Sequence, residues 1–149
     1  MFNRIVVGTD GSDTASVAVE HAIGLAKATG ATLEVVTAYE PPASEGISPE
    51  ERVEVPGDVQ YELGPRQEVN LVLDRAAGQA NRAGVEAHTH AREGDPADAL
   101  LDVAEETRAD LLIVGNKGMT GAKRFLLGSV PNKVSHHAPC GVYIVRTTG

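Results

Sequence analysis

The chain has 149 residues, enough for one ordinary domain with a single buried core. Hydrophobic residues make up 42% of the chain and charged residues 23%, a balance that excludes disorder throughout. The net charge of −8 argues against nucleic acid or an anionic membrane as a partner, and no apolar run approaches the length of a membrane span. We therefore expect one domain over residues 1–149, with no nucleic acid and no membrane as a partner.

The charge is unevenly distributed along the chain. No acidic residue follows Asp110, whereas five basic residues do: Lys117, Lys123, Arg124, Lys133 and Arg146. This segment is either kept free of acids to receive an anion or charged this way by chance, and the asymmetry favours neither interpretation. The single cysteine, Cys140, excludes an internal disulfide and a thiolate metal cluster, so we expect a reducing cytoplasm as the location.

In the first half of the chain, short apolar runs alternate with helical patterns, which is typical of βαβ units. The predicted elements are a strand at 4–8, a helix that follows Ser12-Asp13 and ends at Gly30, a strand at 32–39, a long loop at 40–64 and a helix with apolar spacing from Val69 to Ala80. The loop is predicted because helical and strand periodicity are both lost where prolines 41, 42, 49 and 56 gather.

The second half repeats the alternation. It predicts a strand at 85–92, a helix begun by Asp95 and Pro96, a strand at 111–114, a short helix from about Ser129 with Pro131 in its first turn, and a strand at 142–145. Five strands and four helices in strict alternation predict an α/β fold. We expect an open, doubly wound parallel sheet of five strands with helices on both faces.

In such sheets ligands bind beyond the carboxyl ends of the strands, which directs attention to the loops after the first and fourth strands. Gly115 and Gly118 follow the fourth strand, and nine residues later Gly128 and Ser129 open a helix. Glycines let backbone N–H groups approach a phosphate, and a helix N-terminus adds unpaired donors and the positive end of its dipole. Lys117 supplies charge. The alternative is that these glycines serve only turns and a tight strand–helix junction.

Asp10 is the second candidate because it ends the first strand. Its carboxylate can accept hydrogen bonds from a ribose or hold Mg²⁺. The alternative is that Asp10 caps the following helix, but Ser12 and Asp13 compete for that role, which favours a ligand role for Asp10.

Three stretches together resemble the universal stress protein family. They are Thr9-Asp10-Gly11-Ser12 after the first strand, the run from Asp110 to Gly115, and the Gly-x2-Gly-x9-Gly-Ser pattern ahead of His137-Ala138-Pro139-Cys140. The resemblance covers residues 1–146. The nine-residue glycine spacing is specific to the nucleotide-binding branch of that family.

The resemblance implies strand order 3-2-1-4-5, a homodimer paired through the last strand at 141–146, and ATP or a related adenine nucleotide as ligand. By this resemblance Asp10 would contact the ribose and the backbone of Ala38 would contact the adenine. The residues of the glycine pattern would bind the phosphates. The nucleotide-binding residues that the resemblance indicates are Gly8, Thr9, Asp10, Ala38, Gly115, Asn116, Lys117, Gly118, Gly128, Ser129 and Val130.

Two positions depart from the pattern of this branch. Asn116-Lys117 replaces a Ser or Thr followed by Arg, a tolerable change. Pro131 replaces a second Ser that touches the terminal phosphate in many relatives, and proline offers neither a hydroxyl nor an N–H. The fold is unaffected, but tight triphosphate binding is not expected, and cyclic AMP, which some members prefer, stays a candidate ligand.

Other reactive side chains are set aside. His136 and His137 are adjacent and point about 100° apart on a helix, so they cannot share a metal. His88 and His90 share one face of a strand, but zinc needs a third ligand that the sequence does not offer. Cys140 is expected to pack at the start of the last strand rather than react.

We therefore expect a stress-response or signalling module that binds an adenine nucleotide with at most slow hydrolysis, since no general base is evident near the glycines. The alternative is a slow Mg²⁺-dependent ATPase or nucleotidyl-transferring enzyme that uses Asp10. A receiver-type phosphorylation switch shares the strand order, but it needs an acid paired with Asp10 and a phosphoacceptor Asp after the third strand, which ends in Arg92-Glu93.

Overall fold

The computed structural model describes residues 2–40, 65–116 and 129–147. In chain order the elements are β1 (Arg4–Gly8), α1 (Asp13–Thr29), β2 (Thr32–Tyr39), α3 (Pro65–Arg82), β3 (Ala87–Glu93), α4 (Pro96–Thr107), β4 (Leu111–Gly115), α5 (Ser129–His137) and β5 (Gly141–Val145). The predicted loop at 40–64 lies outside the described residues except for Glu40.

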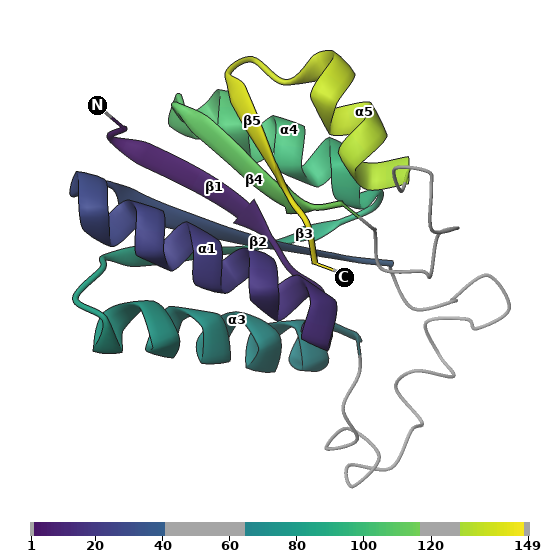
Figure 1. Cartoon of the computed structure of the whole chain (residues 1–149). Helices are drawn as coiled ribbons and strands as arrows, with labels where there is room; N and C mark the ends of the chain where they lie inside the picture. Colours follow the sequence, from purple (N-terminus) through teal and green to yellow (C-terminus); the bar gives the residue numbers. More distant parts are fainter. Residues whose placement is uncertain (1, 41–64, 117–128, 148–149) are drawn as a thin grey trace, which may run out of the picture.

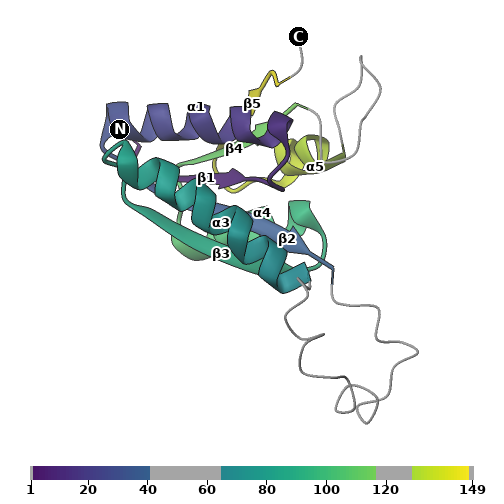
Figure 2. The same ribbon diagram turned by 90° about the horizontal axis from the view of Figure 1, so that it is seen from below.

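The five strands form one parallel sheet in the order β3-β2-β1-β4-β5, which confirms the predicted topology. Helices α1 and α3 cover one face of the sheet, and α4 and α5 cover the other (Figures 1 and 2). In the middle of the sheet Val7 of β1 pairs with Val35 of β2 on one side and with Ile113 of β4 on the other. The strand order therefore reverses between β1 and β4, which makes their carboxyl ends the switch point where ligands bind in folds of this kind.

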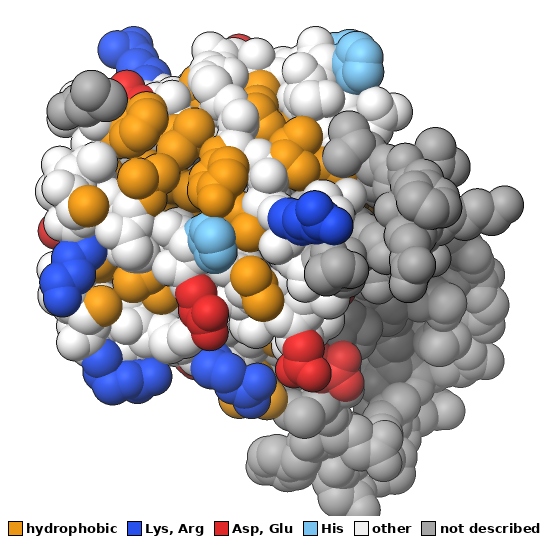
Figure 3. Space-filling view, in the orientation of Figure 1, with side chains coloured by type: hydrophobic (Ala, Val, Ile, Leu, Met, Phe, Trp, Pro, Cys, Tyr) orange, Lys and Arg blue, Asp and Glu red, His pale blue; other side chains and the backbone are white. Residues whose placement is uncertain are grey.

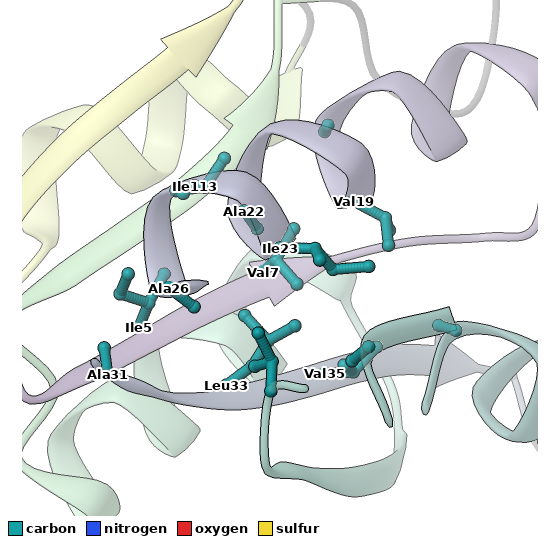
Figure 4. Packing of buried hydrophobic residues seen from close by; sticks show 14 of the residues in the cluster. Ile5, Val7, Val19, Ala22, Ile23, Ala26, Ala31, Leu33, Val35 and Ile113 are labelled. Atoms are coloured by element: carbon teal, nitrogen blue, oxygen red, sulfur yellow. The ribbon is translucent and has the colours of Figure 1, made fainter. Parts of the chain in front are cut away.

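Each face of the sheet buries its own hydrophobic cluster, because alternate strand residues point to opposite faces. Under α1 and α3 the cluster includes Ile5, Val7, Leu33, Val35 and Ile113, with Val19, Ala22 and Ala26 packed on them from α1 (Figure 4). On the opposite face Val6, Val36, Leu112 and Val114 pack against Leu100 and Val103 of α4 and Val134 of α5. Small side chains on α1 let that helix lie close to the sheet.

The helix ends follow the predicted signals. The Ser12 side chain accepts a hydrogen bond from the Ala15 N–H and caps α1, and Gly30 ends that helix in the left-handed conformation with φ 75°. Asp95 caps α4 by accepting from the Asp98 N–H, with Pro96 at the first position. These local interactions position the loops that follow β1 and precede α4.

Several element boundaries differ from the sequence prediction, and β4 and β5 are each one residue longer than predicted, by Gly115 and Gly141. The third strand was expected at 85–92, whereas β3 runs from Ala87 to Glu93. Val85 is buried like a strand residue, but it belongs to the turn after α3, where its N–H donates to the Ala80 carbonyl. Helix α3 begins at Pro65, one turn before its first apolar position at Val69, because its first turn is polar and leaves no periodic signal. No helix in the described part of the chain is long and apolar enough to cross a membrane.

Candidate functional site

A pocket opens at the carboxyl ends of β1 and β4, beside the start of α5. Its lining residues come from β1, the loop after it, α1, α4, β4 and α5: Gly8, Thr9, Asp10, Ser12, Thr14, Ala15, Leu100, Val114, Gly115, Val130 and Pro131. Five predicted ligand residues therefore lie together here, namely Gly8, Thr9, Asp10, Gly115 and Val130. The pocket occupies the switch point of the sheet, as expected for a ligand site in a doubly wound fold.

The loop after β1 is held in place by backbone and hydroxyl hydrogen bonds around Thr9. Its N–H donates to the Val36 carbonyl at 3.0 Å, and its carbonyl accepts from the Thr37 hydroxyl at 2.8 Å. The Thr9 hydroxyl in turn accepts from the Gly11 N–H at 3.0 Å, and the residue is only 4% exposed. This loop is therefore tied to β2 and forms a fixed wall of the pocket.

Asp10 lies on this wall, and the structure resolves the competition for the helix cap. Ser12 caps α1, whereas Asp10 uses one oxygen, Oδ1, to accept from the Ser12 N–H at 2.9 Å. This hydrogen bond closes an Asx-turn, which holds the Asp10 side chain in one orientation. Among the described residues the other carboxylate oxygen, Oδ2, has no hydrogen-bond partner. Asp10 thus presents a positioned acceptor at the pocket, and it is the one acidic side chain among the pocket's described lining residues.

Gly8 has a packing reason to be glycine. A Cβ at this position would come within 2.9 Å of Leu100 Cδ2, closer than side-chain carbons approach. Leu100 belongs to α4 and lines the same pocket, so a side chain at position 8 would require the Leu100 side chain to shift. The observed position of the Leu100 side chain in the pocket wall therefore requires glycine at position 8.

Helix α5 brings its N-terminal turn to the pocket. Val130 and Pro131 line it, and Pro131 is fully buried, whereas Ser129 begins the helix on the exposed side and is not a lining residue. The first N–H groups of a helix have no partner within the helix and carry the positive end of its dipole. An anionic group in this pocket would therefore lie near the positive end of the α5 dipole. Position 131 offers no N–H donor to it, because the residue is proline.

The remaining predicted residues fall outside the pocket lining or outside the described residues. Ala38 lies near the end of β2, half-buried on the same face as Val130, and does not line the pocket. Asn116 follows Gly115, and its amide oxygen accepts hydrogen bonds from Thr147. Lys117, Gly118 and Gly128 lie outside the described residues.

Lys133, one of the five basic residues after Asp110, does not serve the pocket. Its Nζ lies 2.8 Å from Asp98 Oδ1 and 3.5 Å from Asp95 Oδ2, at the start of α4. The hydrogen bond to Asp98 raises the pKa of Lys133 above its usual value. Part of the basic excess seen in the sequence is thus neutralised by acids from elsewhere in the chain.

Both histidines of β3 that the sequence analysis set aside lie beside a glutamate. His90 Nε2 lies 2.8 Å from Glu34 Oε1, and His88 Nε2 lies 2.9 Å from Glu86 Oε2. The described residues contain no group of three or more His, Cys, Asp or Glu side chains that could hold a metal ion. Burial raises the pKa of the half-buried Cys140 thiol, which favours its protonated, unreactive form.

Sequence reasoning missed several lining residues, among them Leu100, Val114, Thr14 and Ala15. Leu100 lies in the predicted helix that Asp95 and Pro96 begin, Val114 lies in the predicted strand at 111–114, and both side chains are buried. Nothing in the local pattern shows that this buried face ends at a pocket. That information requires the positions of β1, β4 and α4 relative to one another.

The sheet order and the pocket at its switch point define a doubly wound α/β domain with a pocket between β1, β4 and α5. Within that class the chain belongs to the universal stress protein family, whose sequence model matches residues 1–146. Among curated relatives, the universal stress protein MJ0531 of Methanocaldococcus jannaschii is 35% identical over 146 residues, covering 98% of this chain and 83% of the relative. YxiE of Bacillus subtilis is 36% identical over 150 residues, covering 98% of this chain and all of the relative.

Solved structures agree with this assignment. A universal stress protein crystallised in complex with cAMP is 34% identical, with a TM-score of 0.72 over 99% of this chain and 98% of that one. The protein MJ0577 superposes with a TM-score of 0.81 over 100% of this chain and 99% of its own, but at 21% identity this likeness concerns the fold alone.

Proposed function

We propose that this protein is a stress-response or signalling module that binds an adenine nucleotide in the pocket between β1, β4 and α5. The observation that carries the proposal is the convergence of Asp10, Gly115 and the first turn of α5 on one pocket at the switch point. The relative that is 34% identical over nearly the whole chain was crystallised with cAMP, which supports an adenine nucleotide as the ligand class.

The pocket suggests a role for each part of the ligand. The Oδ2 atom of Asp10 accepts from ribose hydroxyls, since Oδ1 is engaged with the Ser12 N–H. The N-terminus of α5 and the backbone at Gly115 face the phosphate. The backbone of Ala38 meets the adenine, and Lys117, Gly118, Gly128 and Ser129 complete the phosphate site, as the resemblance implies.

Pro131 bears on which nucleotide binds. It is buried and lines the pocket, yet it supplies neither an N–H nor a hydroxyl to a terminal phosphate. A triphosphate then has fewer donors than in a site with serine at this position. AMP and cyclic AMP therefore compete with ATP on nearly equal terms.

We infer a binding module rather than a fast enzyme. Asp10 is the one described lining carboxylate that would hold Mg²⁺ with the phosphates of ATP in place of its ribose contact, and the described lining residues include no second carboxylate and no histidine to act as a base. The slow Mg²⁺-dependent ATPase or nucleotidyl-transferring enzyme is the alternative outcome. We place the module in the cytoplasm, where a half-buried single thiol such as Cys140 stays reduced.

The test compares Asp10→Asn with Asp13→Asn. Asparagine at position 10 keeps an oxygen for the Ser12 N–H but loses the charged acceptor for ribose. AMP affinity, measured by calorimetry, should fall by about 10- to 100-fold, as expected for a hydrogen bond to a charged group. Asp13 is an exposed residue in the first turn of α1 outside the pocket, and its variant should bind like the wild type. A wild-type protein that binds none of AMP, cyclic AMP or ATP contradicts the proposal, and rapid phosphate release from ATP contradicts the choice of module over enzyme.

A homodimer through the last strand, residues 141–146, completes the proposal. Among the strands of the described residues, β5 lies at one edge of the sheet and pairs with β4 alone. Hydrophobic side chains gather on the face where β5 and α1 lie (Figure 3), and Tyr143 of β5 is 37% exposed there. An edge strand with free backbone groups and an exposed aromatic ring is readily paired with its symmetry mate.

A further inference from the structure

Asn116, which follows the pocket-lining residue Gly115, is hydrogen-bonded to residues near the C-terminal end of the chain. Its N–H donates to the Val145 carbonyl at 2.7 Å, next to the last residue pair of β4 and β5, Gly115 with Val145. Its amide oxygen accepts two hydrogen bonds from Thr147, one from the N–H and one from the hydroxyl, both at 2.9 Å. We call these three hydrogen bonds the Asn116 clamp.

The clamp fixes the point at which β4 ends and the pocket begins. Gly115, the preceding residue, lines the pocket and pairs with Val145, the last residue of β5. Thr147 lies beyond the end of β5 and does not line the pocket. Its two hydrogen bonds therefore lie beyond the paired residues of β5 and join the following segment to Asn116, the residue after Gly115.

We propose that Asn116 is a positioning residue for the nucleotide pocket and that it acts through Thr147. This inference rests on the proposed function of the pocket. When the clamp is broken, the backbone at Gly115 samples conformations that do not bind the ligand, and the observed affinity falls in proportion to the fraction of molecules in the binding conformation. Asn116 was predicted from the sequence as a nucleotide-binding residue, and this proposal gives it an indirect role instead.

The two roles of Asn116 differ in their consequences for Thr147. If the amide of Asn116 contacts a phosphate directly, Thr147→Val leaves binding unchanged, and Asn116→Ala weakens AMP but not adenosine, which has no phosphate. If Asn116 positions the pocket wall, Thr147→Val weakens AMP and adenosine alike. Comparison of the two ligands therefore separates the two roles.

The experiment measures AMP and adenosine binding by calorimetry for Thr147→Val, Thr147→Ser and Asn116→Ala, with amide hydrogen exchange at Thr147 in the free proteins. We expect affinity for both ligands to fall about three- to tenfold in Thr147→Val, which loses one hydrogen bond, and further in Asn116→Ala, which loses two. Thr147→Ser retains the hydroxyl and should bind within twofold of wild type. Exchange at Thr147 should accelerate in Asn116→Ala.

Thr29→Val is the matched control, because the Thr29 hydroxyl also donates to a single carbonyl oxygen, that of Leu25. Thr29 is the last residue of α1, at the opposite end of that helix from its pocket-lining residues. The variant should lose stability without losing affinity. Wild-type affinity in Thr147→Val, or unaltered exchange at Thr147 in Asn116→Ala, overturns the inference while leaving the proposed function intact. A wild-type protein that binds neither ligand overturns both.

Discussion

Val72 of α3 packs directly onto Gly11 in the loop after β1. A Cβ at position 11 would lie 2.7 Å from Val72 Cγ2, and Gly11 has φ 83°, a conformation that other residues adopt only with strain. The contact joins the loop after β1, which lines the pocket, to α3, a helix that comes much later in the sequence. It makes Gly11 sensitive to substitution for two separate reasons.

Three glycine variants separate these reasons. Gly11→Ala combines backbone strain with the clash and should lower the free energy of unfolding by more than about 1–2 kcal/mol. Gly30→Ala has φ 75° but no atom within 4 Å of the new Cβ, so it should show the strain alone. Gly24→Ala, inside α1 with open space around it, should be neutral or stabilising by up to about 1 kcal/mol. Urea denaturation measures all three, and equal losses for Gly11→Ala and Gly30→Ala would show that the Val72 contact is unimportant.

Pro131→Ser should change the choice of nucleotide. In the wild type we expect AMP and cyclic AMP to bind within about tenfold of ATP, a difference under roughly 1.4 kcal/mol. Serine restores a hydroxyl and an N–H, so ATP should gain selectively, by roughly 1.5–3 kcal/mol at most. Calorimetric titration of the three nucleotides with Mg²⁺ measures this, with Pro139→Ser, outside the pocket lining, as the control. Strong ATP preference in the wild type would refute the argument from Pro131.

Tyr143→Asp should dissociate the proposed homodimer. The substitution replaces an exposed aromatic ring on the edge strand with a charge, which opposes pairing with a second strand. Sedimentation velocity should show a wild-type dimer at micromolar concentration and an association at least about tenfold weaker in the variant. Leu71→Asp is the matched control, since Leu71 is 51% exposed on α3, away from β5. A monomeric wild type, or equal effects of the two substitutions, would argue against the interface at residues 141–146.

The pair formed by Arg92 and Glu106 predicts a pH dependence of stability. Two hydrogen bonds of 2.8 and 2.9 Å join the guanidinium of β3 to the carboxylate of α4, and they lower the pKa of Glu106 below its ordinary value of 4.5. Because the pKa is lowered on folding, the pair stabilises the fold above about pH 4.5, and this contribution is lost as the pH falls through the lowered pKa. Glu106→Gln should therefore be less stable than wild type at pH 7 and approach it in acid.

Denaturation curves at several pH values measure this difference. Glu105→Gln, the neighbouring exposed residue, is the control and should differ little from wild type at any pH. A difference between Glu106→Gln and wild type that persists unchanged into acid would mean that charge pairing with Arg92 is not its cause.

The sequence by itself determined the order and type of the elements and the ends governed by local contacts. Strand β2 lies at the predicted residues 32–39, and Ser12, Gly30 and Asp95 end or begin their helices as expected. These features depend on residues a few positions apart, whose interactions follow from spacing alone. The third strand was misplaced by two residues at its start because Val85, buried in a turn, has the same apolar character as a strand residue.

Only the tertiary structure decided which residues meet at the pocket and which contacts they make with other elements. The contact of position 8 with Leu100, the hydrogen bonds of Asn116 with Thr147, and the pairing of Lys133 with Asp98 all join residues more than 30 positions apart. Sequence patterns report how a side chain relates to its own helix or strand. Whether it then faces a ligand, a neighbouring helix or an opposite charge depends on how separate elements pack, and that is settled only when the sheet and its two helical layers are assembled.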